Sequence, residues 1–272
     1  MAERIVFRQV LCLAKTGSSF VRRLFARHGA QHEYDFESIA SVCLGGIGSR
    51  NLDSDRRYLE ERRRRLNGTL DVSTSLVFLH ERSPIDISDG VTLLLARDPY
   101  TWIRSVIQYS FRVHQSGELE QEGGWRKRYG IMFTPNASRL TSSLKSMSSS
   151  SEFTRIAALD LLRTWIRYTG FIAKTYDCHA QNRVSLILTK ELSSVDSYET
   201  MESLFGFKKS VAPLDLFNPV NRTAIDRSVE SVILAELPNI QDIRVDEKED
   251  LRTALSDAQN LYSEQVEDYI DV

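Results

Sequence analysis

The stretch IVFRQVLCLAKTGSSF, residues 5–20, decides the fold of this chain. Seven of its first nine residues are apolar, and three of these are β-branched, which predicts a buried strand. The following residues contain Gly17, which allows the backbone to turn tightly. Beyond the turn, Val21, Leu24 and Phe25 recur at helical spacing. The sequence therefore predicts a strand, a turn and a helix in immediate succession.

The turn has the composition of an anion-binding site. The first N–H groups of a helix have no partners within the helix and lie at the positive end of its dipole. Lys15 adds a point charge, and Ser18 and Ser19 add hydroxyl donors, so we expect a phosphate or sulfate rather than a carboxylate. The alternative is an ordinary serine-capped turn. The loop of nucleoside triphosphatases is not matched, because Lys15 precedes Gly17.

A second strand-to-helix junction supplies a second candidate anion site. Residues 91–96 form an apolar run that predicts a strand, and a helical pattern follows it. Asp98 and Pro99, between the two, suit a helix cap and a first helical turn. Arg97 leaves the strand end, where α/β folds bind ligands, and its forked cation fits a phosphate. Ser105, two turns along the helix, is expected to add a hydroxyl to the same site.

Taken in this order, the two motifs resemble those of the sulfotransferases that use 3′-phosphoadenosine-5′-phosphosulfate (PAPS). Residues 15–20, Lys-Thr-Gly-Ser-Ser-Phe, look like the 5′-phosphosulfate loop of that family. Arg97-Asp98-Pro99 with Ser105 looks like its 3′-phosphate motif. Phe20 is expected either on the adenine or in the core. The resemblance implies that Lys15 is catalytic and that the donor is bound by Lys15, Thr16, Gly17, Ser18, Ser19, Phe20, Arg97 and Ser105.

The resemblance also implies the fold and the reaction. The fold is α/β, a single sulfotransferase domain over residues 1–272 with a central, mainly parallel sheet flanked by helices and a P-loop-kinase-like core. The reaction moves a sulfuryl group from PAPS to a hydroxyl or amine of a small metabolite or natural product, without a metal. The basic, glycine-containing motif that many small-molecule members carry near the C-terminus is absent. Alternatives are a nucleotide or small-molecule kinase on a related fold and a catalytically inactive nucleotide-binding module.

The catalytic base is expected at the end of a third strand. Residues 75–79 form a short apolar run that predicts this strand and places His80 at its end. An imidazole titrates near neutral pH, which suits removal of a proton from the acceptor. Many family members have a His on the strand before the Arg-containing one, so the resemblance implies that His80 is the base. Glu81 is the substitute, and a purely structural, hydrogen-bonded role for His80 is the other alternative.

The rest of the chain predicts a lid and further secondary structure. Residues 115–151 are rich in Gly and Ser and are expected to form a flexible lid or acceptor loop. Thr189, after an expected strand over 184–188, stands where the family commonly has an adenine-side Tyr, so no adenine contact is implied there. Helices are expected over 153–176, from Met201 to a stop at Gly206, and over 251–269.

Composition limits the classes of protein to which the chain can belong. A hydrophobic content of 42% and a charged content of 26% are ordinary for a globular protein, and a net charge of −2 gives no general attraction to nucleic acid. No apolar stretch reaches the length of a membrane span, and the N-terminus lacks a secretory signal, so we expect a cytoplasmic protein without a membrane partner. Cys12, Cys43 and Cys178 show no metal-ligand spacing.

Overall fold

The computed structural model describes residues 7–13, 15–17, 20–21, 24, 70–73, 90–115, 150–179, 183–206 and 227–268. The chain groups into two compact units. The first comprises Met1–Ala96 and Lys174–Arg222, and the second comprises Arg97–Ala173 and Thr223–Val272. The single domain expected from the sequence stays a prediction.

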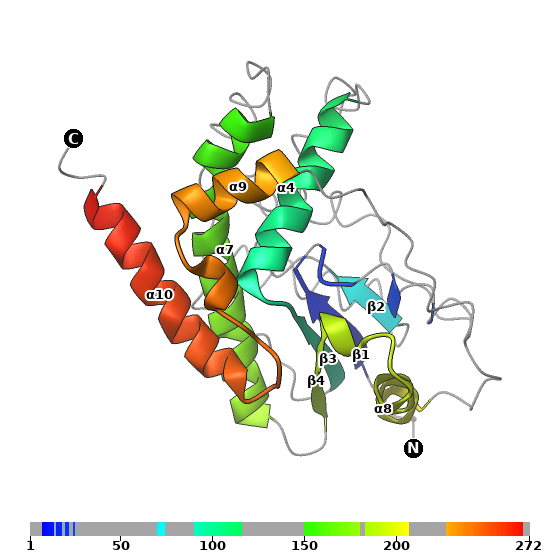
Figure 1. Cartoon of the computed structure of the whole chain (residues 1–272). Coiled ribbons are helices and arrows are strands. Elements are labelled where there is room, and N and C mark those ends of the chain that lie inside the picture. The colour runs from blue at the N-terminus through cyan, green and yellow to red at the C-terminus, as the bar shows by residue number, and fades with distance from the viewer. Residues whose placement is uncertain are drawn as a thin grey trace, which may run out of the picture. The chain divides into compact units, whose positions relative to one another are not determined.

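The first unit contains a parallel β-sheet, which described residues build from four strands (Figure 1). The strands are β1 (Phe7–Cys12), β2 (Leu70–Ser73), β3 (Gly90–Ala96) and β4 (Val184–Leu188). Their order is β2-β1-β3-β4, and every neighbouring pair is parallel. The apolar runs correctly predicted β1, β3 and β4. They did not predict β2, because its four residues, Leu70–Ser73, alternate between apolar and polar side chains over too short a length to indicate a strand.

The core of the first unit lies on one face of this sheet. Val10 and Cys12 of β1 are two residues apart, so they point to the same face, where Leu93 and Leu95 of β3 join them. Residues of the helix after the turn and of α8 (Val195–Phe205) cover this face: Val21, Leu24, Tyr198, Met201 and Phe205. The alternate residue Leu94 is also buried, as is usual where parallel strands are covered on both faces. The predicted strand, turn and helix are confirmed.

The short helix α8 begins and ends with standard caps. The Ser194 hydroxyl accepts a hydrogen bond from the Ser197 N–H over 3.1 Å. At the other end, Gly206 has a φ of 65°, the left-handed conformation that glycine adopts without a steric penalty. The helix stop expected at Gly206 is therefore confirmed.

The second unit is helical within the described residues. It contains α4 (Pro99–Gln115), most of α7 (Ser150–His179), α9 (Arg227–Glu236) and α10 (Asp250–Asp268). Figure 1 shows α10 running along α7, and the two helices approach closely where Gly170 lies near Leu255. None of the described helices combines the length and apolarity needed to cross a membrane.

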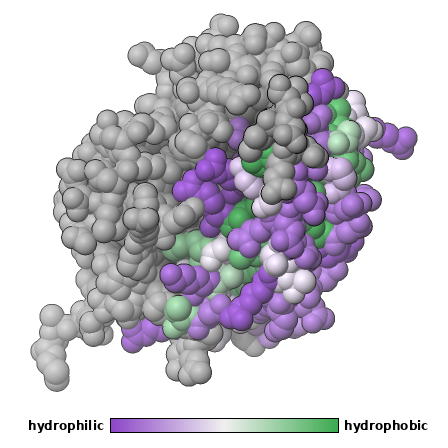
Figure 2. All heavy atoms as spheres, turned by 90° about the vertical axis from the view of Figure 1, so that its left-hand side faces the viewer, coloured by the Kyte–Doolittle hydropathy of each residue, from purple (hydrophilic) through white to green (hydrophobic). Residues whose placement is uncertain are grey.

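Helix α10 confirms the amphipathic pattern of the sequence. Its buried residues follow the spacing of one helical face: Leu251, Ala254, Ala258 and Leu261. The intervening residues are exposed apart from half-buried Leu255, and the described surface on the side of α10 is mostly hydrophilic (Figure 2). The described part of the chain is thus an α/β fold with a small parallel sheet and amphipathic helices.

Several expected features lie outside the described residues. They are the strand over 75–79, His80, Glu81, Ser18, Ser19 and nearly all of the lid. Only the ends of the lid are described: Gln115 is the last residue of α4, and Ser150 and Ser151 begin α7.

Candidate functional site

The described strands provide a ligand position at the carboxyl edge of the sheet. β1 lies between β2 and β3, so the strand order reverses beside β1. In open parallel sheets, ligands bind outside the carboxyl ends of the strands at such a reversal. Cys12 of β1 pairs with Leu95 of β3, so the two strands end nearly level with one another. The two motifs found in the sequence begin directly after these two strand ends.

The turn after β1 is tight and carries an uncommon backbone conformation. Lys15 has a φ of 69° and Gly17 a φ of 100°. A side chain other than glycine costs about 1–2 kcal/mol in the left-handed region, so Lys15 must be held there by its surroundings. A methyl group on Gly17 would overlap the side chain of Leu192. The prediction that Gly17 permits a tight turn is confirmed, and the close neighbour adds a second reason for glycine.

Thr16 supports the turn from within the protein. Its side chain is buried, and its hydroxyl donates to the Leu13 carbonyl oxygen over 2.5 Å. Its backbone N–H points at the same oxygen over 3.3 Å. The helix then starts, because the Gly17 carbonyl accepts from the N–H groups of Phe20 and Val21. Both donors of Thr16 are thus engaged inside the turn, and half-buried Phe20 packs against the core of the sheet.

Thr189, the residue that follows β4, contacts this turn. Its hydroxyl lies 2.9 Å from the carbonyl oxygen of Thr16 and 3.0 Å from that of Ala96, the last residue of β3. Thr189 begins the short 3-10 helix η2 (Thr189–Glu191). The Glu191 carboxylate caps this helix by accepting a hydrogen bond from the Leu188 N–H over 3.0 Å. The sequence did not identify Thr189 as a supporting residue. Its position directly after a parallel strand was the signal available.

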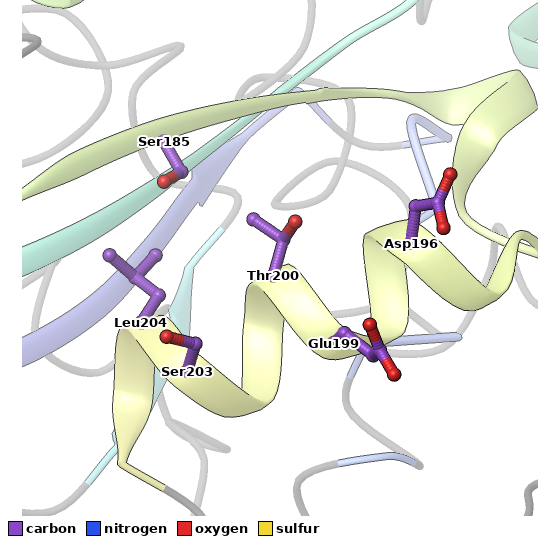
Figure 3. A pocket seen from close by; sticks show the side chains of 6 residues that line it. All are labelled: Ser185, Asp196, Glu199, Thr200, Ser203 and Leu204. Carbon is purple, nitrogen blue, oxygen red and sulfur yellow. The ribbon is translucent and has the colours of Figure 1, made fainter.

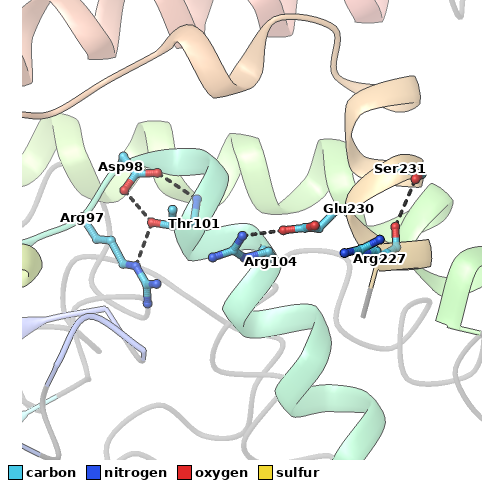
Figure 4. A network of polar contacts seen from close by, with 7 residues as sticks. All are labelled: Arg97, Asp98, Thr101, Arg104, Arg227, Glu230 and Ser231. Atoms are coloured by element: carbon cyan, nitrogen blue, oxygen red, sulfur yellow. Dashed lines mark hydrogen bonds and ion pairs between the residues drawn. The ribbon is translucent and has the colours of Figure 1, made fainter. Parts of the chain in front are cut away.

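The residues around Arg97 fix the direction of its side chain (Figure 4). The Arg97 Nε–H donates to the Thr101 hydroxyl over 2.9 Å, and that hydroxyl donates to an Asp98 carboxylate oxygen. The second Asp98 oxygen accepts from the Thr101 N–H over 2.8 Å, so Asp98 caps α4 as the sequence predicted. The indole N–H of Trp165 donates to the Arg97 carbonyl oxygen over 2.8 Å. Side chain and backbone of Arg97 are therefore both anchored.

Burial makes Arg97 a favourable partner for an anion. Desolvation lowers the pKa of its guanidinium from the ordinary value, the Asp98 carboxylate opposes this shift, and Arg104 adds to it. Arginine nevertheless remains charged at neutral pH, so Arg97 is a partly desolvated cation. A bound phosphate would compensate for the lost hydration. The hydrogen bonds from Arg97 to Thr101 and from Thr101 to Asp98 hold the Arg97 guanidinium in one orientation.

Arg104 is held by a different set of groups. It lies 2.5 Å from a carboxylate oxygen of Glu230 on α9, and its guanidinium lies 5.5 Å from the ring centre of Tyr100. Burial, followed by the charge of Glu230, raises the pKa of the Tyr100 hydroxyl above its ordinary value.

Ser105, expected at the 3′-phosphate, is half-buried one turn beyond Thr101, on the same side of α4.

No protein-family model matches the chain, and no curated protein matches its sequence. Its function is therefore inferred from the residues themselves.

A separate cavity of about 580 Å³ borders β4 and α8 in the first unit (Figure 3). Ser185 of β4 lines one side, and α8 contributes Asp196, Glu199, Thr200, Ser203 and Leu204. The described residues that line this cavity include two carboxylates and no basic side chain, and their charge would repel a phosphate or sulfate. The two cations singled out by the sequence, Lys15 and Arg97, lie instead in the segments that follow β1 and β3.

Proposed function

We propose that the protein is a PAPS-dependent sulfotransferase with a P-loop-kinase-like core. It transfers a sulfuryl group to a hydroxyl or amine of a small metabolite or natural product. The turn from Lys15 to Phe20 takes the 5′-phosphosulfate end of the donor, with backbone N–H groups and the Ser18 and Ser19 hydroxyls as ligands. Arg97 and Ser105 take the 3′-phosphate and so select PAPS over simple adenine nucleotides.

The observation that carries this proposal is the attachment of both motifs to adjacent parallel strands. β1 and β3 are neighbours at the reversal of strand order, β1 leads into the Lys15 turn, and β3 leads into Arg97. An isolated capped turn would not require a second, buried cation after the neighbouring strand. The glycine at position 17 and the anchored guanidinium of Arg97 support the same assignment.

The chemistry follows from the roles of these residues. The acceptor oxygen or nitrogen forms a bond to sulfur while the bond from sulfur to the bridging oxygen of the donor breaks. His80 accepts the proton of the acceptor, with Glu81 as the alternative base. Lys15 stabilises the negative charge that develops on the bridging oxygen. The desulfated product, 3′,5′-bisphosphoadenosine (PAP), then dissociates.

Calorimetric titration with PAP and with 5′-AMP tests the proposal. PAP carries both phosphates and 5′-AMP lacks the 3′-phosphate, so PAP is expected to bind at least about tenfold more tightly. Arg97→Ala should reduce this preference, while an Arg155→Ala control, a substitution of an exposed arginine paired with Glu236, should leave it unchanged. Equal affinity for the two nucleotides, or no binding, would contradict the donor assignment.

The same titration separates the alternatives. Tight binding of ATP with magnesium, together with phosphoryl transfer, would favour a kinase. PAP binding without transfer to a broad panel of acceptors would favour an inactive nucleotide-binding module.

A further inference from the structure

The loop after β4 contributes a group to the turn that carries Lys15. The Thr189 hydroxyl lies 2.9 Å from the Thr16 carbonyl oxygen and 3.0 Å from the Ala96 carbonyl oxygen, all within the first unit. A hydroxyl has one proton, so the two carbonyls share it. The Thr16 carbonyl belongs to the turn after β1, and the Ala96 carbonyl belongs to the last residue of β3. Thr189 thereby joins the two strand ends at which the motifs begin.

The same loop also restrains the turn by packing. The Leu192 side chain occupies the space next to Gly17 that a Cβ would need, and the Thr189 methyl group lies 3.9 Å from that position. The turn needs such support, because Lys15 adopts a positive φ that its side chain disfavours. A polar contact and an apolar contact from one loop therefore hold the turn in a single conformation.

We propose that Thr189 is a positioning residue for the 5′-phosphosulfate end of the donor, an inference that rests on the proposed function. Its hydroxyl fixes the Thr16 carbonyl, and with it the direction of the Gly17 N–H, which belongs to the same planar peptide group. Thr189 does not touch the donor. Its side chain is directed at main-chain carbonyls of the turn and of the β3 end.

Two substitutions separate positioning from simple stabilisation. Thr189→Val keeps the shape and removes the hydroxyl, whereas Thr189→Ser keeps the hydroxyl and removes the methyl group. Each variant is titrated with PAP and with adenosine 3′-phosphate, which lacks the 5′-phosphate. Thr189→Val should weaken PAP binding about tenfold and change adenosine 3′-phosphate binding by less than about twofold. Thr189→Ser should retain both affinities within about twofold. Equal losses for both ligands in Thr189→Val, or an unchanged PAP affinity, would overturn the inference.

Amide hydrogen exchange tests the contact independently of the donor. The N–H groups of Phe20 and Val21 bond to the Gly17 carbonyl, so they report on the turn. Thr189→Val should accelerate their exchange, and Thr189→Ser should not. If the wild-type protein fails to bind PAP, the proposed function is wrong, while this measurement still decides whether Thr189 holds the turn. Unchanged exchange in Thr189→Val would show that it does not.

Discussion

Replacement of Gly17 by alanine should be one of the most damaging small substitutions in the first unit. Two costs combine: the backbone has a φ of 100°, and the new methyl group would overlap Leu192. A positive φ costs a non-glycine residue about 1–2 kcal/mol. Forcing an extra methyl group into a filled space costs about 1–3 kcal/mol more. We therefore expect Gly17→Ala to lower the free energy of unfolding by about 2–5 kcal/mol.

Gly206→Ala is the matched control for this substitution. Gly206 lies in the same unit with a φ of 65°, and, its chain neighbours aside, no described residue has an atom within 4 Å of the position that its Cβ would take. It should show only the backbone cost of about 1–2 kcal/mol. Urea unfolding followed by far-UV circular dichroism measures both variants. Gly17→Ala should also cost less in a Leu192→Ala background, where the overlap is relieved. A cost no larger than that of Gly206→Ala would refute the role of Leu192.

Three further substitutions test the proposed site. Lys15→Ala should lower the rate of sulfuryl transfer at least about a hundredfold but weaken PAP binding much less, because the lysine charge acts mainly on the leaving oxygen. Steady-state kinetics measures the rate, and calorimetry measures PAP binding. Thr101→Val removes the hydroxyl that links Arg97 to the Asp98 carboxylate, so PAP affinity should fall about threefold to tenfold. Thr101→Ser keeps the hydroxyl and should bind PAP nearly as tightly as the wild type. An unchanged PAP affinity in Thr101→Val would contradict this role of Thr101. His80→Ala should abolish transfer at neutral pH, and undiminished turnover would assign the base to Glu81.

The sequence predicted those parts of the fold that depend on local patterns. β1, β3 and β4 are mostly apolar runs, and the cap at Asp98 and the stop at Gly206 are signals that lie within one helical turn. β2 escaped prediction because four residues of weak alternation carry little information. The patterns identified these strands, whereas the mainly parallel sheet was expected from the resemblance to the sulfotransferases; the described strands are parallel.

The contacts that complete the site could not be predicted in the same way. The hydroxyl of Thr189 meets Thr16 across most of the chain, and Arg104 meets Glu230 across a comparable separation. Such contacts depend on how strands and helices pack, and no local pattern encodes them. Thr101 is different, because it lies one turn from Arg97 and directly follows the capping pattern, so helix geometry alone would have predicted its place beside the guanidinium.

The conformation of Lys15 bears on the two interpretations of the turn. A serine-capped helix start has no need of a long cationic side chain at a positive φ, where glycine or asparagine would be accommodated at lower cost. This turn instead has lysine at that position, and the loop after β4 contacts the next two residues, Thr16 and Gly17. Strained residues that the surrounding structure holds in place are concentrated at ligand sites. The lysine charge, placed directly after β1 and beside the reversal of strand order, favours the anion-binding interpretation over the capped turn.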